Sequence, residues 1–328
     1  MTGAEFAASA FGDQGVDREY YYWAGPVALL GPAMAGDVEP HSPLVLNPQE
    51  SYFNAWISSK GVIASCHYDM YHNFFVQVSG RKRFTLFPPS DWHNLQVFPI
   101  SHPSHRQCQV NMLDPHDTAE LERATGTGPI VVQVGPGDVL YLPPFWFHHV
   151  EALDASMSVN VWSYTRDFSD AHGIFKLPVP FEDDWPERLK FTAVFAYIGN
   201  LAERCDVLDT STDDYITAMV TARFLTLRPA ELLKAFNRAS ATSRDRYVCA
   251  TPWEDQPSIK ALGGASGAQA LRDKFAKRST EICKRLLKVP KAQRSILLED
   301  FIEELVEYSA GPQNVLAYLE TCYAPASL

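Results

Sequence analysis

The spacing of apolar and polar residues changes along the chain, with one pattern before about residue 165 and another after about residue 185. From residue 50 to 165, short apolar runs are separated by turn residues, and apolar and polar side chains alternate clearly at 156–161. Alternation with a period of two is typical of strands that bury one face. Several such strands at short spacing predict an antiparallel sandwich or barrel.

After residue 185, apolar residues recur at helical spacing instead. Helices are expected at 191–205, 213–225, from Pro229 onward, 269–288 and 291–308. The stretch 251–267, rich in Pro, Gly and Ser, is expected to be a loop. The pattern therefore predicts a mainly β domain with α additions over residues 1–168, followed by a helical region over 169–328.

The two last expected helices, which together span residues 269–308, carry apolar stripes. Such stripes indicate either packing onto the β-rich domain or a surface for dimerisation. A homodimer through these helices is one of the two expectations.

Composition and charge exclude several classes of protein. Hydrophobic residues make up 46% of the 328 residues, which excludes global disorder. No apolar run reaches the roughly 18 residues that span a bilayer, and the first residues lack the pattern of a secretory signal. Residues 1–165 hold 7 Lys and Arg against 16 Asp and Glu, a net −9 of the total −11, which disfavours a nucleic-acid partner.

The cysteines are scattered and include no CxxC pair. They are Cys66, Cys108, Cys205, Cys249, Cys283 and Cys322. This distribution predicts reduced thiols in a cytoplasmic or nuclear protein, rather than a disulfide framework or a zinc site.

The chemistry of the chain is concentrated around His67 and Asp69, which lie two residues apart in an expected strand. Their side chains therefore project to the same side and can reach a common metal ion. A third ligand is expected from the end of the segment 145–149, which follows the expected strand 138–142. Two histidines and one carboxylate form the facial triad of non-heme iron(II) oxygenases. On its own, however, this spacing is more often a surface or structural pair.

A longer pattern surrounds these residues. Residues 67–89 read HYDMYHNFFVQVSGRKRFTLFPP, residues 137–149 read GDVLYLPPFWFHH, and residues 160–162 read NVW. Over about residues 15–165 the chain resembles the JmjC family of cupin-fold oxygenases, with the best match to the branch of asparaginyl and wybutosine-tRNA hydroxylases. The resemblance implies a double-stranded β-helix (jelly-roll) core followed by C-terminal helices. It also implies the use of iron(II), 2-oxoglutarate and dioxygen.

The resemblance makes His67, Asp69 and His148 the iron ligands, and His149 is the rival for the third place. Lys82 matches the lysine that pairs with the distal carboxylate of 2-oxoglutarate. As the middle residue of Arg-Lys-Arg on an expected strand, Lys82 would face inward between two outward cations.

Further positions are matched to the cosubstrate and the substrate of the family. The side chains expected to line the cosubstrate pocket are Asn73, Asn160, Trp162 and one tyrosine among Tyr20, Tyr21 and Tyr22, with Tyr21 chosen. Trp162 is nearly as well explained as a core residue. Arg106 and Gln107 match a segment in which the glutamine contacts the target side chain of an asparaginyl hydroxylase.

Two features depart from the family pattern. Ala64 stands where the asparaginyl hydroxylase has a threonine hydroxyl near the cosubstrate, and Ser65 would compensate only if the strand shifted. The chain also begins close to the tyrosine cluster, so an abbreviated N-terminus is expected.

The resemblance implies a hydroxylase that decarboxylates 2-oxoglutarate to succinate. A protein side chain is the expected substrate, because of the match around Gln107 and the acidic first half. A wybutosine-type tRNA base is the alternative, favoured by the segment 146–148 and the less acidic helical region. Lysine demethylation ranks lower, and a metal-binding scaffold without activity is disfavoured by the complete triad together with Lys82.

Overall fold

The computed structural model describes residues 3–12, 20–38, 43–125, 128–224, 247, 249 and 252–323. The chain divides into two compact units. The first comprises Met1–Asn94 and Arg106–Arg166, and the second comprises Leu95–His105 and Asp167–Leu328. This division differs from the expected boundary at 168/169 by two residues, and it assigns Leu95–His105 to the helical unit, which the sequence pattern did not indicate.

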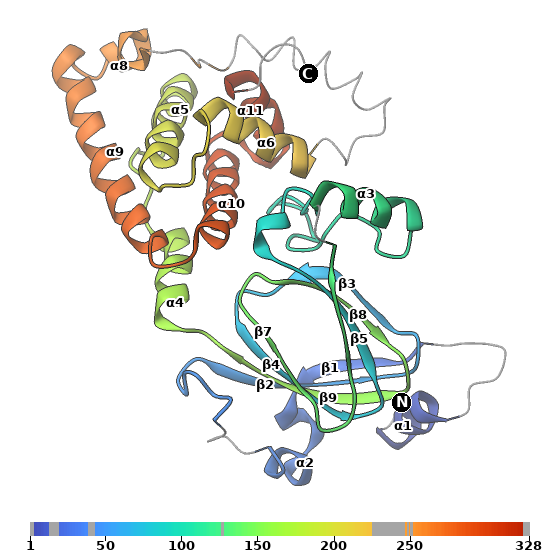
Figure 1. Ribbon diagram of the computed structural model, residues 1–328. Helices are drawn as coiled ribbons and strands as arrows, with labels where there is room; N and C mark the ends of the chain where they lie inside the picture. Colours follow the sequence, from blue (N-terminus) through green and yellow to red (C-terminus); the bar gives the residue numbers. More distant parts are fainter. Residues whose placement is uncertain are drawn as a thin grey trace. The chain divides into compact units, whose positions relative to one another are not determined.

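The first unit is built on two antiparallel sheets (Figure 1). The five-stranded sheet has the order β1 (Tyr22–Pro26), β2 (Ser51–Ser58), β9 (Ser156–Ser163), β4 (His72–Ser79) and β7 (Val139–Leu142). The four-stranded sheet has the order β3 (Ile63–Tyr68), β8 (Phe147–Ala152), β5 (Lys82–Phe87) and β6 (Ile130–Val134). The expected mainly β jelly-roll core with α additions is confirmed.

Short helices accompany the sheets in this unit. They are α1 (Gly3–Phe11), the 3-10 helix η1 (Val27–Leu30), α2 (Pro32–Gly36), the 3-10 helix η2 (Pro89–Asp91) and α3 (Pro115–Thr125).

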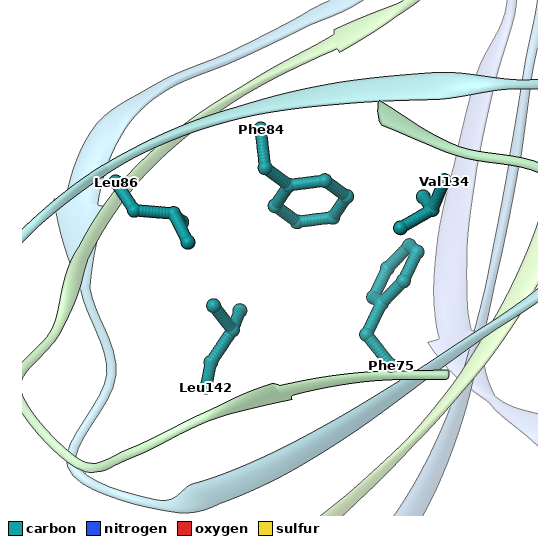
Figure 2. Packing of buried hydrophobic residues seen from close by; sticks show 5 residues of the cluster. All are labelled: Phe75, Phe84, Leu86, Val134 and Leu142. Atoms are coloured by element: carbon teal, nitrogen blue, oxygen red, sulfur yellow. The ribbon is translucent and has the colours of Figure 1, made fainter. Parts of the chain in front are cut away.

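Apolar side chains from both sheets meet in a core between them (Figure 2). Phe75 and Leu142 of the five-stranded sheet face Phe84, Leu86 and Val134 of the four-stranded sheet. The rings of Phe75 and Phe84 pack edge to face with their centroids 4.9 Å apart. The period-two alternation of these strands therefore directs one face of each sheet into the same interior.

A tight turn at Gly80, which has a φ of +67°, carries the chain from β4 in one sheet to β5 in the other. A Cβ atom at this position would lie 2.2 Å from the carbonyl oxygen of Ala155, so only glycine fits without a shift of the backbone. Because the turn fixes where β5 begins, it also fixes which face of the sheet Lys82 occupies.

The second unit is helical in the part that the structure describes. Its helices are α4 (Arg166–His172), α5 (Glu187–Arg204), α6 (Thr212–Phe224), α8 (Pro257–Lys260), α9 (Gly264–Leu286), α10 (Lys291–Ala310) and α11 (Val315–Tyr323), with 3-10 turns η3 (Gly173–Lys176), η5 (Trp253–Asp255) and η6 (Pro312–Asn314). The helices expected at 191–205, 213–225, 269–288 and 291–308 are confirmed. The helix expected from Pro229 lies outside the described residues. The loop expected at 251–267 is wrong in part, because Pro257 occupies the first turn of a short helix and α9 already begins at Gly264.

The apolar stripes of α9 and α10 are buried within this unit. The buried stripe residues are Leu271, Phe275, Ile282, Leu286, Leu297, Leu298, Phe301, Ile302 and Leu305. Both helices pack against α5, so packing inside one chain accounts for the stripes. None of the helices within the described ranges is long and apolar enough to cross a membrane.

A buried ionic cluster joins α6 to α10. The guanidinium of Arg223 is fully buried and lies 2.7 Å from Asp300, 2.5 Å from Glu303 and 3.7 Å from Glu299. The backbone N–H of Ile100 donates to Glu303 at 2.8 Å, which ties residues 95–105 to the helices. Burial raises the pKa of Glu303 to about 7, although Arg223 opposes that shift.

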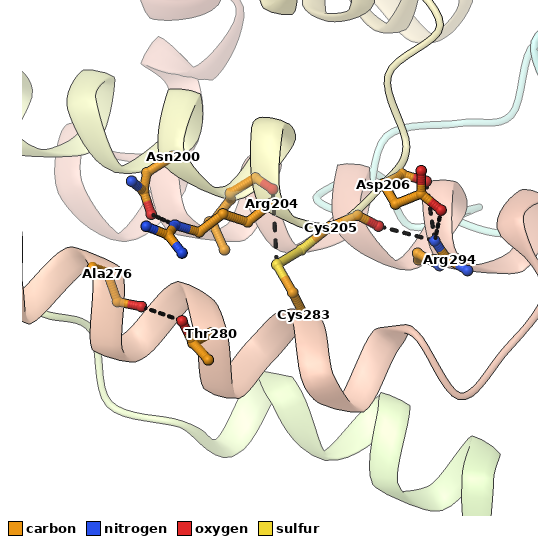
Figure 3. The surroundings of a disulfide bond; sticks show 9 residues. Asn200, Arg204, Cys205, Asp206, Ala276, Thr280, Cys283 and Arg294 are labelled. Atoms are coloured by element: carbon orange, nitrogen blue, oxygen red, sulfur yellow. Dashed lines mark hydrogen bonds and ion pairs between the residues drawn. A yellow bond between two sulfur atoms is a disulfide. The ribbon is translucent and has the colours of Figure 1, made fainter.

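Two disulfides also lie in the helical unit, which corrects the expectation that all six cysteines are reduced. Cys205 at the end of α5 is bonded to Cys283 of α9, and Cys249 is bonded to Cys322. Arg294 of α10 donates to the carbonyl oxygen of Cys205 at 3.0 Å (Figure 3). The two cysteines of each pair are 78 and 73 residues apart in sequence. Helix packing brings them together, so the local spacing of cysteines could not predict either disulfide.

Candidate metal centre and active site

Three predicted ligands meet where β3 and β8 lie side by side. His67 and His148 are directly opposite one another in the antiparallel pair, and Asp69 follows the end of β3. One ligand atom from each of the three residues lies within 4.8 Å of the others. His148 Nε2 lies 3.7 Å from Asp69 Oδ2, and the two imidazole centroids are 4.2 Å apart.

Backbone carbonyls orient both imidazoles in the same way. His67 Nδ1 lies 2.6 Å from the carbonyl oxygen of Ser65, and His148 Nδ1 lies 3.0 Å from that of Trp146. Because a carbonyl oxygen can only accept, each Nδ1 must carry the proton, which leaves the Nε2 lone pair free for a metal ion. Each histidine thus uses the carbonyl two residues before it to select the same tautomer.

The site also keeps His148 neutral. Burial and the neighbouring His67 lower the pKa of His148 to about 4, against an opposing effect of Asp69. A metal ion binds the neutral imidazole, so this ring is ready to coordinate at neutral pH.

The turn before β8 fixes the backbone at Asp69. The N–H of Phe145 donates to the carbonyl oxygen of Asp69 at 2.7 Å. The backbone of Phe145 has a φ of +65°, which residues other than glycine rarely adopt. The ring of Phe145 stacks on Tyr68 at 5.2 Å, and Phe147 contacts the same tyrosine edge-on. This aromatic packing holds the strained turn in place and, with it, the third ligand.

His149 is placed differently from His148. It pairs with Thr85 of β5, and burial lowers its pKa. His149 is absent from the group of ligand atoms that meet, so the geometry selects His148 for the third position. Two nitrogen donors and one carboxylate on one side of a shared point suit the facial arrangement that binds iron(II), and these residues therefore fit that metal.

A cavity adjoins the triad and lies between the two sheets. It is lined by His67, Asp69 and His148 together with Tyr22, Trp56, Ser58, Val62, Ala64, Asn73, Phe75, Lys82, Phe84, Leu142, Val150, Ala152, Asn160 and Trp162. The structure therefore brings Lys82, Asn73, Asn160 and Trp162, all expected from the sequence, to one cavity with the triad.

Lys82 is the buried cation of this cavity. The residue is 5% exposed, its Nζ donates to Ser158 Oγ at 2.8 Å, and it lies 5.3 Å above the ring of Phe75. Its neighbours in sequence point outward, where Arg81 pairs with Asp154 and Arg83 pairs with Glu151. Burial lowers the pKa of Lys82 to about 8.

The two pocket asparagines are linked across the five-stranded sheet. Asn160 Nδ2 donates to Asn73 Oδ1 at 3.0 Å, and Trp56 Nε1 donates to Asn160 Oδ1 at 2.9 Å. Trp162 packs edge-on against Trp56 and stacks on Tyr71 at 5.3 Å. These contacts hold the amide groups in fixed orientations and give the cavity an aromatic wall.

The register of β1 decides which tyrosine faces the cavity. Tyr22 pairs with Ser58, and both line the cavity. Tyr21 is not among the lining residues. Its N–H donates to Ser59 Oγ at 3.0 Å, and its ring lies beside Phe6. Successive residues of a strand point to opposite faces, so Tyr22 lines the cavity although Tyr21 was chosen from the sequence.

Ala64 lines the cavity, as expected from its position three residues before the first ligand. A register shift lies between Ala64 and His67, but the residue that it exposes to solvent is Ser65. The hydroxyl beside Lys82 comes instead from Ser158 of β9, which the sequence reasoning missed. Ser158 could have been predicted, because it lies two residues before Asn160 in the same strand and its side chain therefore points to the same face of the sheet.

The segment with Arg106 and Gln107 lies along β3 beside the triad. Gln107 is bridged to His67, and the carbonyl oxygen of Arg106 accepts from the N–H of Tyr68 at 3.2 Å. Arg106 has a φ of +71°, so the chain turns sharply there. Gln107 is exposed and adjoins a metal ligand, which leaves it accessible to a substrate.

Comparisons with known proteins place the site in a family. Residues 12–170 match the family model described as a cupin-like domain. The lysine-specific demethylase JMJ32 of Arabidopsis thaliana is 30% identical over 152 residues, covering 37% of this chain and 44% of that protein. HSPB1-associated protein 1 of Rattus norvegicus is 37% identical over 121 residues, covering 35% and 24%.

The chain thus spans less than half the length of these two curated relatives. Among solved structures, the ribosomal oxygenase YcfD of Escherichia coli is 20% identical with a TM-score of 0.25, covering 42% of this chain and 32% of that one. The family match, together with the two sheets and the His-Asp-His group between them, identifies residues 12–170 as a cupin-like domain of the JmjC type.

Proposed function

We propose that this chain is an iron(II)- and 2-oxoglutarate-dependent oxygenase that hydroxylates a protein side chain. The observation that carries the proposal is Lys82, a buried cation in the same cavity as the triad. Within the described part of the chain it contacts a hydroxyl and an aromatic ring, but no carboxylate. A buried charge without a counter-charge is costly, so the cavity suits an anionic ligand.

A dicarboxylate with a keto group satisfies both ends of this cavity. One end requires donors for a carboxylate, which Lys82 and Ser158 supply, with the phenol of Tyr22 on the same lining. The other end requires a chelating group next to His67, Asp69 and His148. 2-Oxoglutarate carries both groups, and this complementarity supports it as the cosubstrate.

Iron(II) bound by the triad would supply dioxygen activation coupled to the decarboxylation of 2-oxoglutarate to succinate. The residues of this chain supply the rest. The carbonyl oxygens of Ser65 and Trp146 keep both imidazoles in the coordinating tautomer. Trp56 and Trp162 exclude water from one wall of the cavity, and Asn73 and Asn160 hold each other's amide groups in place in its lining.

A protein side chain is the substrate that we favour. The acidic first half of the chain disfavours a nucleic-acid backbone and is compatible with a basic or neutral polypeptide. Arg106 and Gln107, beside His67, are the proposed substrate contacts. A cytoplasmic or nuclear location stays a prediction, and the two disulfides of the helical unit weigh against the reduced thiols from which it was drawn.

Demethylation of a methylated lysine is the second candidate, because two relatives are named lysine-specific demethylases. Both reactions begin with hydroxylation of a carbon atom. They differ afterwards, since a hydroxylated N-methyl group is lost as formaldehyde while a hydroxylated side-chain carbon keeps its oxygen.

The first experiment measures succinate formed from 2-oxoglutarate with iron(II) and a reductant. His67→Ala and Asp69→Ala should abolish both succinate formation and stoichiometric iron binding while leaving the fold intact. His149→Ala should be milder than His148→Ala. Wild-type turnover in both of the first two variants would overturn the proposal.

The substrate class is tested by mass spectrometry of proteins and of tRNA from cells with and without the gene. A protein that is about 16 Da lighter in the deletion strain supports hydroxylation. Methylated lysine that accumulates in that strain supports demethylation, and a change confined to tRNA contradicts both.

Homodimerisation remains a prediction. Leu298 and Leu305 are buried within one chain, so substituting them would damage the fold before it reported on a dimer. Leu287, between α9 and α10, is 49% exposed and is the better probe. If this face forms a dimer, the wild type should sediment as a dimer and Leu287→Arg as a monomer, and a wild type that is monomeric at all accessible concentrations would contradict the prediction.

A further inference from the structure

Two thiols that take no part in the proposed chemistry lie together beside the metal centre. Cys66 of β3 is 2% exposed and Cys108 is 8% exposed. Their sulfur atoms are 2.8 Å apart, although 42 residues separate them in sequence. Each cysteine adjoins a residue of the site, because Cys66 precedes His67 and Cys108 follows Gln107.

The backbone holds the two cysteines opposite one another. The N–H of Cys108 donates to the carbonyl oxygen of Cys66 at 2.8 Å, and the N–H of Tyr68 donates to Arg106 at 3.2 Å. Together with the bridge between His67 and Gln107, these bonds make residues 106–108 a short strand along β3. Opposed residues in such an antiparallel pair have Cα atoms about 5.5 Å apart, which lies within the range that a disulfide spans.

We propose that Cys66 and Cys108 form a reversible redox site, in which a hydroperoxide oxidises the two thiols to a disulfide. A disulfide has sulfur atoms about 2.05 Å apart, so the pair closes with less than about 1 Å of movement. The backbone that carries the two cysteines is already in the required register. This proposal does not depend on the proposed function, since the cysteines belong to the chain whether or not iron binds.

The chemistry balances with one peroxide molecule. One thiol attacks the peroxide, the O–O bond breaks, and a sulfenic acid and one water molecule form. The second thiol then attacks that sulfur, the S–O bond breaks, and a second water molecule leaves with the remaining proton. The two thiols lose two electrons to the peroxide, and an added dithiol returns them by exchange. Hydrogen peroxide, little larger than water, is the oxidant of this proposal, because Cys66 is 2% exposed and Cys108 is 8% exposed, which disfavours a larger oxidant.

The link would act on the wall of the active site. It would join β3, which carries the ligand His67, to the segment that carries Gln107. With both thiols reduced, the backbone hydrogen bonds of Tyr68 and Cys108 hold the two strands together. Gln107 is exposed, so its side chain buries little surface that would add to this pairing. A covalent link therefore restricts separation of this segment from the metal-ligand strand.

The first test uses the full-length, metal-free protein treated with hydrogen peroxide, alkylated, digested and analysed by mass spectrometry. We expect a peptide pair joined through Cys66 and Cys108, with a loss of about 2 Da that dithiothreitol reverses. Cys66→Ser and Cys108→Ser should each lose this change and leave the Cys205–Cys283 pair intact. Alkylation of both thiols after peroxide, or sulfinic acid on either one without a link, would overturn the proposal.

The second test is hydrogen exchange on the wild-type protein, which avoids any effect of substitution on folding. Exchange at the amides of Tyr68 and Cys108 should slow at least several-fold in the oxidised form and recover after reduction. The amide of Phe84, which lies in the four-stranded sheet away from the pair, should be unchanged. Equal exchange at Tyr68 and Cys108 in both forms would contradict a link that restrains the wall.

Discussion

Both units bury a cation, and the surroundings of the two cations differ. In the helical unit, the fully buried guanidinium of Arg223 is surrounded by Glu299, Asp300 and Glu303. In the β unit, Lys82 is almost as deeply buried, but within the described residues its one polar partner is the hydroxyl of Ser158. The first charge is neutralised by the protein itself, whereas the second is left for a ligand to neutralise.

The comparison separates a structural charge from a binding charge. Burial alone does not distinguish them, since each position is close to fully buried. What distinguishes them is whether carboxylates of the chain lie within ion-pair distance, because an unneutralised charge in a low-dielectric interior reduces the free energy of unfolding unless a ligand compensates it. The same contrast predicts opposite effects when each cation is replaced by an apolar residue.

The largest expected effect on stability is at Arg223. Arg223→Met removes one partner of a buried cluster and leaves three carboxylates without a cation, so the free energy of unfolding should fall by about 3–5 kcal/mol. Urea denaturation of the full chain measures it. Lys288→Met, which removes an exposed ion pair with Asp170, is the matched control and should change stability by less than about 1 kcal/mol. Equal effects of the two substitutions would show that the cluster is not a structural element.

At Lys82 the expected effects on stability and on binding have opposite signs. Lys82→Met removes a buried cation without a counter-charge, so the free protein should be no less stable than wild type. Its affinity for 2-oxoglutarate should fall by about two to three and a half powers of ten, equivalent to about 3–5 kcal/mol, with iron affinity unchanged. Calorimetric titration with the metal held constant measures this.

Arg83→Ala is the control for Lys82, because Arg83 lies on the outward face and pairs with Glu151. It should leave the 2-oxoglutarate affinity within about twofold of wild type. Should Arg83 prove critical and Lys82 dispensable, the register of β5 and the proposed anion site would both be wrong.

A smaller effect is expected at Tyr22. Burial raises the pKa of its phenol to about 12, so the hydroxyl stays protonated and can donate to a carboxylate, although the whole residue is 49% exposed. Tyr22→Phe should weaken 2-oxoglutarate binding by about 1.5 kcal/mol, roughly tenfold. Tyr21→Phe should have no such effect, since Tyr21 is not among the residues that line the cavity. The reverse order in the same titration would restore Tyr21 to the cosubstrate site.

The pH dependence of binding is the most specific effect. Burial lowers the pKa of Lys82 to about 8 in the free protein, so the cation is lost as pH rises above that value. The affinity for 2-oxoglutarate should therefore be constant below about pH 8 and fall by up to about tenfold per pH unit above it. Lys82→Met should bind weakly with no such dependence, and a wild-type profile that is flat to pH 10 would contradict the assignment.

The same shift predicts how stability depends on pH. Since the pKa of Lys82 is lower in the folded chain than in the unfolded one, the unfolded chain binds more protons between about pH 8 and 10.5. The contribution of Lys82 to the free energy of unfolding should therefore rise with pH across that window, and bound anion should remove the rise. A rise of the free energy of unfolding with pH is expected of a buried cation that has no counter-charge until a ligand binds.

Much of the site could be predicted because its residues lie close together in sequence on regular strands. His67 and Asp69 share a face by the period of a strand, and Lys82 faces inward between two outward arginines for the same reason. Residues far apart in sequence were harder to place. Tyr22 replaces Tyr21 at the cavity because pairing with Ser58 fixes the register of β1, which three consecutive tyrosines do not specify.

The sequence by itself determined the strand periodicity, the candidate ligands and the helical character of the second half, since each depends on local spacing. Only the tertiary structure decided that α9 and α10 bury their apolar stripes within one chain, that Cys205 reaches Cys283, and that Ser158 lies beside Lys82. It also decided that Lys82 lacks a carboxylate partner among the described residues while Arg223 has three. Burial and charge neutralisation depend on segments brought together from across the chain, and no local pattern contains that information.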